Sequence, residues 1–70
     1  MRPEVAIELC DTILSLCEQL PEKAEEFKEG VTQRTQNLRD WIEENERCTG
    51  PQARALQNIE EGVRAWLPDS

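Results

Sequence analysis

The stretch that decides the fold is residues 21–47, PEKAEEFKEGVTQRTQNLRDWIEENER. Apolar or small side chains recur in it at intervals of three, four or seven residues, which keep to one face of an α-helix. They are Ala24, Phe27, Val31, Leu38 and Trp41. Because a residue before proline is pushed out of the helical conformation, Leu20–Pro21 separates this stretch from what precedes it. We therefore predict one long helix over residues 22–47.

Gly30 lies inside this predicted helix, where glycine is less favourable than alanine by about 1 kcal/mol. A kink near Gly30 is therefore open as an alternative. The apolar stripe nevertheless keeps its phase from Phe27 across Gly30 to Ile42, and a loop would disturb that phase. We favour a continuous helix.

Shorter helical patterns flank the long one, over residues 4–20 and residues 50–67. Pro3 stands near the start of the first pattern, and Pro51 stands in the first turn of the last one, where proline is favourable. Thr49 followed three residues later by Gln52 is typical of a capping box. Short connections make neighbouring helices antiparallel, so residues 1–70 are predicted to form one all-α domain, an antiparallel three-helix bundle.

The segment Thr49–Trp66 has the pattern T-x-x-Q-x-x-A-L-x-N-I-x-x-G-V-x-x-W. This pattern resembles the terminal helix of small uncharacterised helical proteins in bacteria and their phages. The resemblance covers about a quarter of the chain and implies a helix but no activity.

Residues 4–20 carry two apolar stripes, which together span an arc of about 200° around the helix. One stripe is Ala6, Leu9, Ile13, Leu16 and Leu20, and the other is Ile7, Cys10, Leu14 and Cys17. The other two helices show arcs of only about 120°, enough for a three-helix core. We expect the surplus to be covered by a second copy in a homodimer. The alternative is that helix one lies between both neighbours and buries both stripes internally.

The predicted helix lengths differ, at about 39 Å for residues 22–47 and about 25 Å for each neighbour. Counted back from Leu20–Pro21, helix one should run beside helix two only as far as about Leu38. Trp41 and Ile42 should then be left uncovered. Trp41 and Trp66 both fall in the core phase of their helices, and we expect Trp66 to be a core residue. The predicted contact residues are accordingly Ile7, Cys10, Leu14, Cys17, Trp41 and Ile42.

Eight basic residues oppose fifteen acidic ones, giving a formal net charge of −7. Direct binding to nucleic acid or to an anionic membrane is unfavourable for such a chain. The sequence begins with Met1 and has no apolar run long enough for a membrane span or a signal peptide. We expect a complete cytoplasmic protein that contacts another protein. A single core of 70 residues is marginal, which also favours a partner.

The chain has no His and no Tyr, which removes the commonest general base and the usual imidazole metal ligand. We expect no enzyme activity, cofactor, metal or small-molecule substrate. Cys10 and Cys17 lie in apolar settings, where thiols act as small hydrophobic side chains. Cys48 is the thiol expected to be exposed. A reversible disulfide between Cys48 and Cys10 is an alternative that the sequence leaves open.

A second function fits the charge. Small acidic proteins inhibit nucleic-acid-binding proteins when their carboxylates imitate phosphate charge and bind a basic groove. The acidic residues of the long helix would supply that surface. They are Glu22, Glu25, Glu26, Glu29, Asp40, Glu43, Glu44 and Glu46. Helical spacing also places such acids on a plain solvated face, so the two interpretations stay open.

Overall fold

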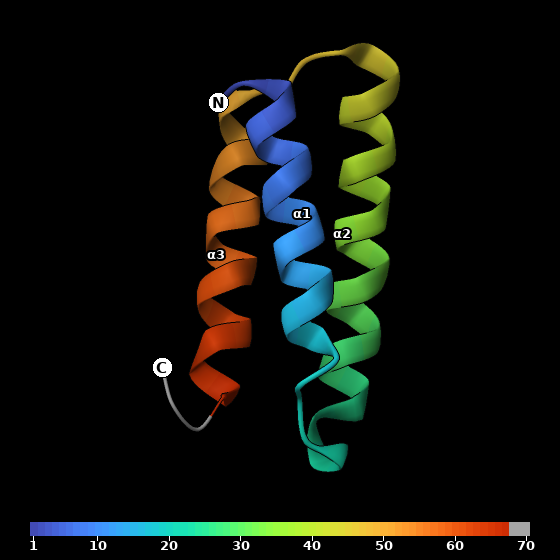
Figure 1. Ribbon diagram of the computed structural model, residues 1–70, viewed down its shortest axis with the longest axis vertical. Coiled ribbons are helices and arrows are strands. Elements are labelled where there is room, and N and C mark those ends of the chain that lie inside the picture. The colour runs from blue at the N-terminus through green and yellow to red at the C-terminus, as the bar shows by residue number, and fades with distance from the viewer. Residues whose placement is uncertain (68–70) are drawn as a thin grey trace.

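The computed structural model describes residues 1–67, and in that part of the chain it confirms the predicted three-helix bundle. Helix α1 spans Pro3–Cys17, α2 spans Glu25–Asn45, α3 spans Gly50–Trp66, and a single 3-10 turn, η1, spans Glu22–Ala24. Consecutive helices run in opposite directions, with the α1–α2 connection at one end and the α2–α3 connection at the other (Figure 1).

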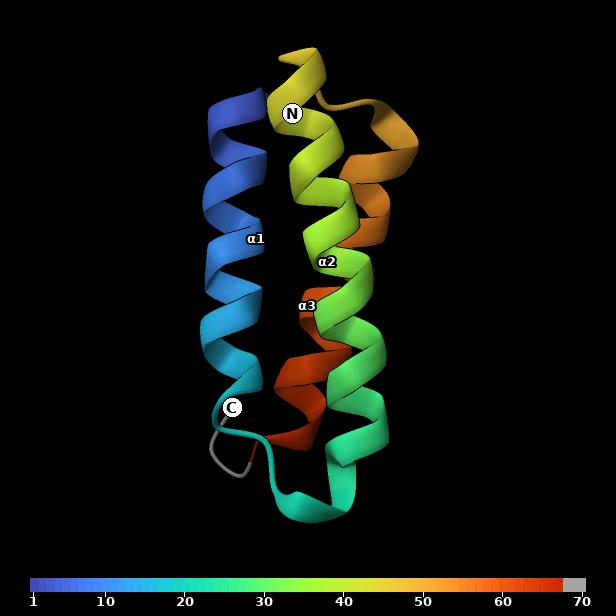
Figure 2. The ribbon, with the colours of Figure 1, turned by 90° about the vertical axis from the view of Figure 1, so that its right-hand side faces the viewer.

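Helix α1 is the central element of the bundle. It packs along both α2 and α3, whereas α2 and α3 touch one another much less. In Figure 1, α1 lies between α3 and α2 and nearer the viewer, and in Figure 2 it stands to one side of both. The core residues come from all three helices: Ala6, Cys10, Ile13, Cys17, Val31, Ile42, Leu56, Ile59 and Val63.

The register of α1 against α2 differs from the prediction. Asp11 of α1 lies opposite Arg39 of α2, with 2.9 Å between Oδ1 and Nε. The first turn of α1 therefore reaches the last turns of α2, and Ile42 is fully buried. The expectation that helix one stops short of Ile42 is wrong. Its cause is the connection of residues 18–24, which descends beyond the end of α1 before α2 begins (Figure 2).

The helix ends follow local signals. The first helix ends at Cys17, three residues earlier than predicted, because the chain must be extended at Pro21, where ψ is 161°. Helix α2 passes through Gly30 without a break, so the continuous helix is confirmed. It ends at Asn45, and the next residue, Glu46, has the left-handed conformation with φ 53°. The predicted capping box of α3 is confirmed: the Thr49 hydroxyl accepts from the Gln52 N–H at 3.3 Å, and the Gln52 side chain accepts from the Thr49 N–H at 3.0 Å.

Thr35 is a polar residue inside this core, and its hydroxyl has no hydrogen-bond partner among the described residues. A buried hydroxyl without a partner destabilises the fold by about 1–3 kcal/mol. Thr35→Val keeps the shape of the side chain, so we expect the free energy of unfolding to rise by about 1 kcal/mol in urea denaturation. Thr12→Val, at an exposed site of α1, is the control and should change it by less than about 0.5 kcal/mol. A loss of stability in Thr35→Val would show that the hydroxyl is bonded in solution.

Candidate contact surface

The structure separates the predicted contact residues into two groups. Cys10, Cys17 and Ile42 are in the core with almost no exposed surface. Ile7 and Leu14 are half-buried on α1, and Trp41 is exposed on α2. Most of the surplus apolar arc of α1 is thus covered within one chain, because α1 lies between α2 and α3. Ile7, Leu14 and Trp41 are the predicted residues that offer surface to a partner.

Neither tryptophan is enclosed by the core. Trp41 is 40% exposed and Trp66 is 39% exposed, although both fall in the core phase of their helices. Trp66 packs against Phe27 of α2, with 5.9 Å between ring centroids. The expectation that Trp66 is a core residue is therefore wrong. Near the end of α3, Trp66 is therefore partly covered and leaves 39% of its surface exposed.

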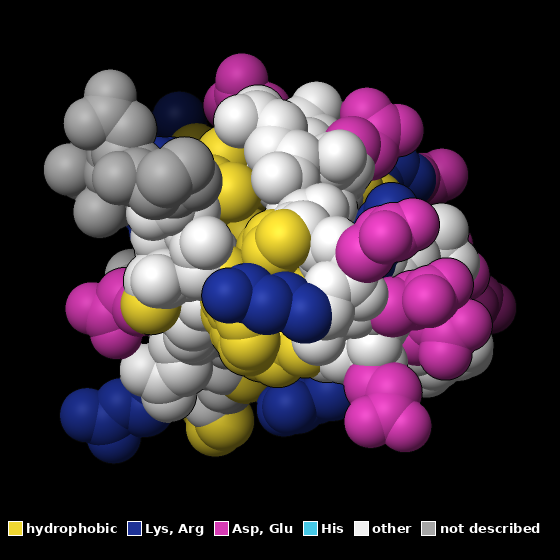
Figure 3. Space-filling model, turned by 90° about the horizontal axis from the view of Figure 1, so that it is seen from below, with side chains coloured by type: hydrophobic (Ala, Val, Ile, Leu, Met, Phe, Trp, Pro, Cys, Tyr) yellow, Lys and Arg dark blue, Asp and Glu magenta, His cyan; other side chains and the backbone are white. Residues whose placement is uncertain are grey.

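The net charge is distributed unevenly along the chain. Residues 1–46 contain twelve of the fifteen acidic residues and five of the eight basic ones, whereas residues 47–70 contain three of each. The whole formal charge of −7 therefore belongs to α1, α2 and their connection, while the α3 part of the chain is neutral. Seen from the end that carries the α1–α2 connection, acidic side chains gather on the α2 side of the molecule (Figure 3).

These acidic residues lie on the outward sides of α1, α2 and their connection. At about 100° per residue, the acids within α2 fall in an arc of about 100° on the side away from Val31, Thr35 and Ile42. The acids of α1 occupy a similar arc, and all of them are exposed. We call this surface the acidic face. It comprises Glu4, Glu8, Asp11, Glu18, Glu22, Glu25, Glu26, Glu29, Asp40, Glu43, Glu44 and Glu46.

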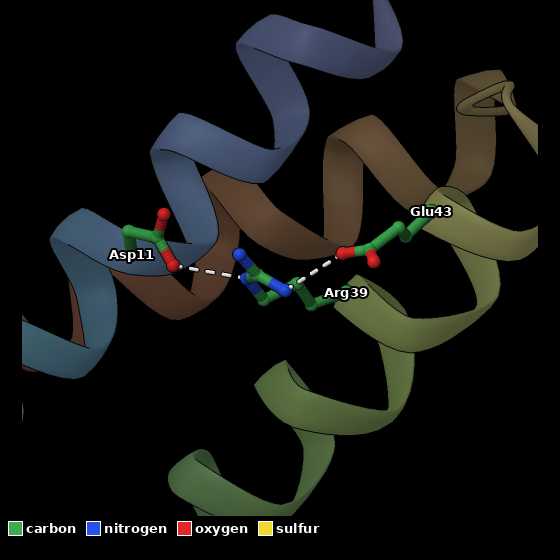
Figure 4. Close-up of polar contacts among 3 residues, drawn as sticks. All are labelled: Asp11, Arg39 and Glu43. Atoms are coloured by element: carbon green, nitrogen blue, oxygen red, sulfur yellow. Dashed lines mark hydrogen bonds and ion pairs between the residues drawn. The ribbon is translucent and has the colours of Figure 1, made fainter.

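One arginine joins the two halves of the acidic face. The Arg39 guanidinium donates to Asp11 on α1 and, through Nη1, to Glu43 on α2, each at 2.9 Å (Figure 4). The hydrogen bond and charge of Asp11, followed by Glu43, raise the pKa of Arg39 above its ordinary value. Both carboxylate side chains are more than half exposed, so the pairs contribute little to stability. They connect Asp11 in the acidic arc of α1 with Glu43 in that of α2.

A groove of about 320 Å³ opens at one end of the acidic face, between the first turns of α1 and the last turns of α2. Pro3 and Ile7 supply its apolar surface, and Ile42 lies buried beneath it. The rim is formed by Glu4, Glu43 and Glu46. Sequence reasoning missed this groove, because it depends on the register that brings residues 3–7 beside residues 42–46.

The thiols offer little chemistry at neutral pH. Burial raises the pKa of Cys10 to about 11, and burial also raises the pKa of Cys17. Both are therefore protonated and poorly nucleophilic. Cys48 is half-buried beside α3, and its thiol donates to the Thr49 carbonyl at 3.6 Å. Within residues 1–67, no three Cys, Asp or Glu side chains converge as metal ligands would.

None of the described helices combines the length and the apolar character needed to cross a membrane. No protein family, no curated protein and no solved structure matches this chain.

Proposed function

We propose that this protein is a small interaction module whose acidic face binds a basic surface of another protein. The observation that carries the proposal is the confinement of the entire net charge to α1, α2 and their connection. A face with one sign of charge attracts a complementary surface and repels others. The neutral α3 braces the fold from the opposite side. The proposal assigns no catalytic step to the chain.

A matched pair of charge reversals tests this proposal. Glu29 is exposed on the acidic face and Glu61 is exposed on α3, so Glu29→Lys and Glu61→Lys change the net charge equally. With a lysine-rich helical peptide as probe at about 150 mM salt, where charges are screened beyond about 8 Å, we expect Glu29→Lys to weaken binding several-fold. Glu61→Lys should change it by less than about twofold. Equal losses, or no binding by the unmodified protein, would contradict the proposal.

Inhibition of a nucleic-acid-binding protein is a narrower form of the same proposal. All eight acids of residues 22–46 named above are exposed, as imitation of phosphates requires. Such an inhibitor should displace DNA from a basic groove in a fluorescence competition assay, and Glu25→Lys with Glu29→Lys should abolish the displacement. Displacement that survives this double charge reversal would rule out the narrower form.

A homodimer through α1 is a separate proposal. Less apolar surface of α1 is exposed to support it than the sequence led us to expect. Val5 is 45% exposed and Leu14 is half-buried on that helix. Light scattering at several concentrations should give twice the chain mass of 8.1 kDa for a dimer, and Leu14→Glu should return it to the monomer while leaving it helical. A mass of one chain at all concentrations would remove the dimer.

A further inference from the structure

We propose that the groove between the first turns of α1 and the last turns of α2 is the anchor site for a cationic amphipathic segment of a partner protein. This inference rests on the proposed function and specifies where on the acidic face the partner is held. The occupant is a helical or extended segment that places one apolar side chain in the groove and lysine or arginine on its rim.

The lining of the groove defines that occupant. Pro3 and the half-buried Ile7 leave apolar surface at the bottom, and three glutamates stand around it with no basic residue in the lining. Its volume of about 320 Å³ is at the small end of the range of about 300–1,000 Å³ for ligand pockets, so it accepts about one or two side chains. Lysine and arginine carry apolar stems beneath a charged head, and they match both parts of the lining.

The electrostatics of α2 strengthen the preference for a cation. The C-terminal end of a helix carries partial negative charge and is stabilised by positive side chains. Helix α2 has no basic residue in its last turn, where it carries Glu43 and Glu44, and Glu46 follows directly after the helix. Of the three rim carboxylates, Glu43 already accepts from Arg39, whereas Glu4 and Glu46 are exposed and form no ion pair within 4 Å among residues 1–67. A cationic partner would therefore relieve repulsion at this end.

Two probe peptides of equal charge test the anchor. The first is a helical peptide with leucines along one face and lysines elsewhere, and the second has each leucine replaced by glutamine. We expect the leucine peptide to bind at least about tenfold more tightly in titration calorimetry at about 150 mM salt, since only it fills the apolar part of the groove. Ile7→Ala should remove this preference and leave the glutamine peptide unaffected. Circular dichroism checks the fold of the variant.

A second pair of variants avoids any question of folding. Glu46 has φ 53°, a conformation that asparagine tolerates better than glutamate, so Glu46→Asn removes a rim carboxylate without loss of stability. Glu26→Gln removes one charge about 30 Å away along α2 and is the control. We expect Glu46→Asn to weaken the leucine peptide about threefold to tenfold, and Glu26→Gln by less than about twofold.

The outcomes distinguish the anchor from the proposed function. If the two peptides bind equally and Glu46→Asn behaves like Glu26→Gln, the groove is not the anchor, while binding by the acidic face stands. If neither peptide binds, both proposals fail. A preference for leucine that persists in Ile7→Ala places the apolar contact elsewhere and overturns the groove.

Discussion

Ile13→Ala should lower the free energy of unfolding by about 2–5 kcal/mol, the range for truncating a buried aliphatic side chain. Ile13 is fully buried on α1, where it belongs to the core formed by all three helices. A domain of this size has a total stability near the low end of about 5–15 kcal/mol. The variant should therefore be partly unfolded at 37 °C. Urea denaturation followed by circular dichroism measures the loss.

Leu14→Ala is the matched control on the next position of the same helix. Leu14 is half-buried and does not pack against the core cluster, so its truncation should lower stability by about 1 kcal/mol or less. The contrast follows from the position of α1 between the other helices. Equal losses, or a larger loss for Leu14, would show that α1 is rotated relative to the described packing.

Raising the pH from 9 to 11 should lower stability by roughly 2–3 kcal/mol through Cys10. The unfolded thiol ionises near its ordinary pKa of 9.0, whereas burial raises the pKa in the folded state to about 11. The folded state therefore holds the proton across this window. The contribution of the protonated Cys10 thiol to the stability of the fold is complete below pH 9 and is lost as the pH rises through 11. Urea denaturation at a series of pH values measures the slope.

Cys10→Ala removes this titration and should flatten most of the decline, at the expense of a lower stability at neutral pH. Cys17, whose pKa is also raised by burial, accounts for a remaining decline in the same direction. A decline that is equally steep with and without Cys10 would contradict the assignment, and would attribute the alkaline loss to other groups.

The parts of the fold that follow local rules could be predicted from the sequence. Thr49 and Gln52 fix the start of α3 through bonds within one turn, and Gly30 does not interrupt α2 because the apolar phase continues past it. The start of α3 and the continuity of α2 were predicted correctly, because each depends on residues only a few positions apart in the sequence. The exposed acids of α2 were predictable for the same reason.

The parts that depend on packing could not be predicted. The register of α1 is set by residues 18–24, whose path has no periodic signal. An error in that register placed Ile42 outside the core and concealed the groove at Ile7. Trp66 has the phase of a core residue, but a helical wheel does not show that the side chains beside it, Phe27 among them, leave 39% of its surface exposed. The helical phase of a residue predicts the direction in which its side chain points, but it does not predict whether another element covers that side chain.

The most direct test of the acidic face is a nuclear magnetic resonance titration of the labelled protein with the leucine–lysine peptide. We predict that amide shift changes cluster on α1 and α2, with the largest around Ile7 and Glu46, and that the amides of residues 57–65 in α3 move little. Changes that are largest on α3 would contradict the account, as would a spectrum that the peptide leaves unaltered.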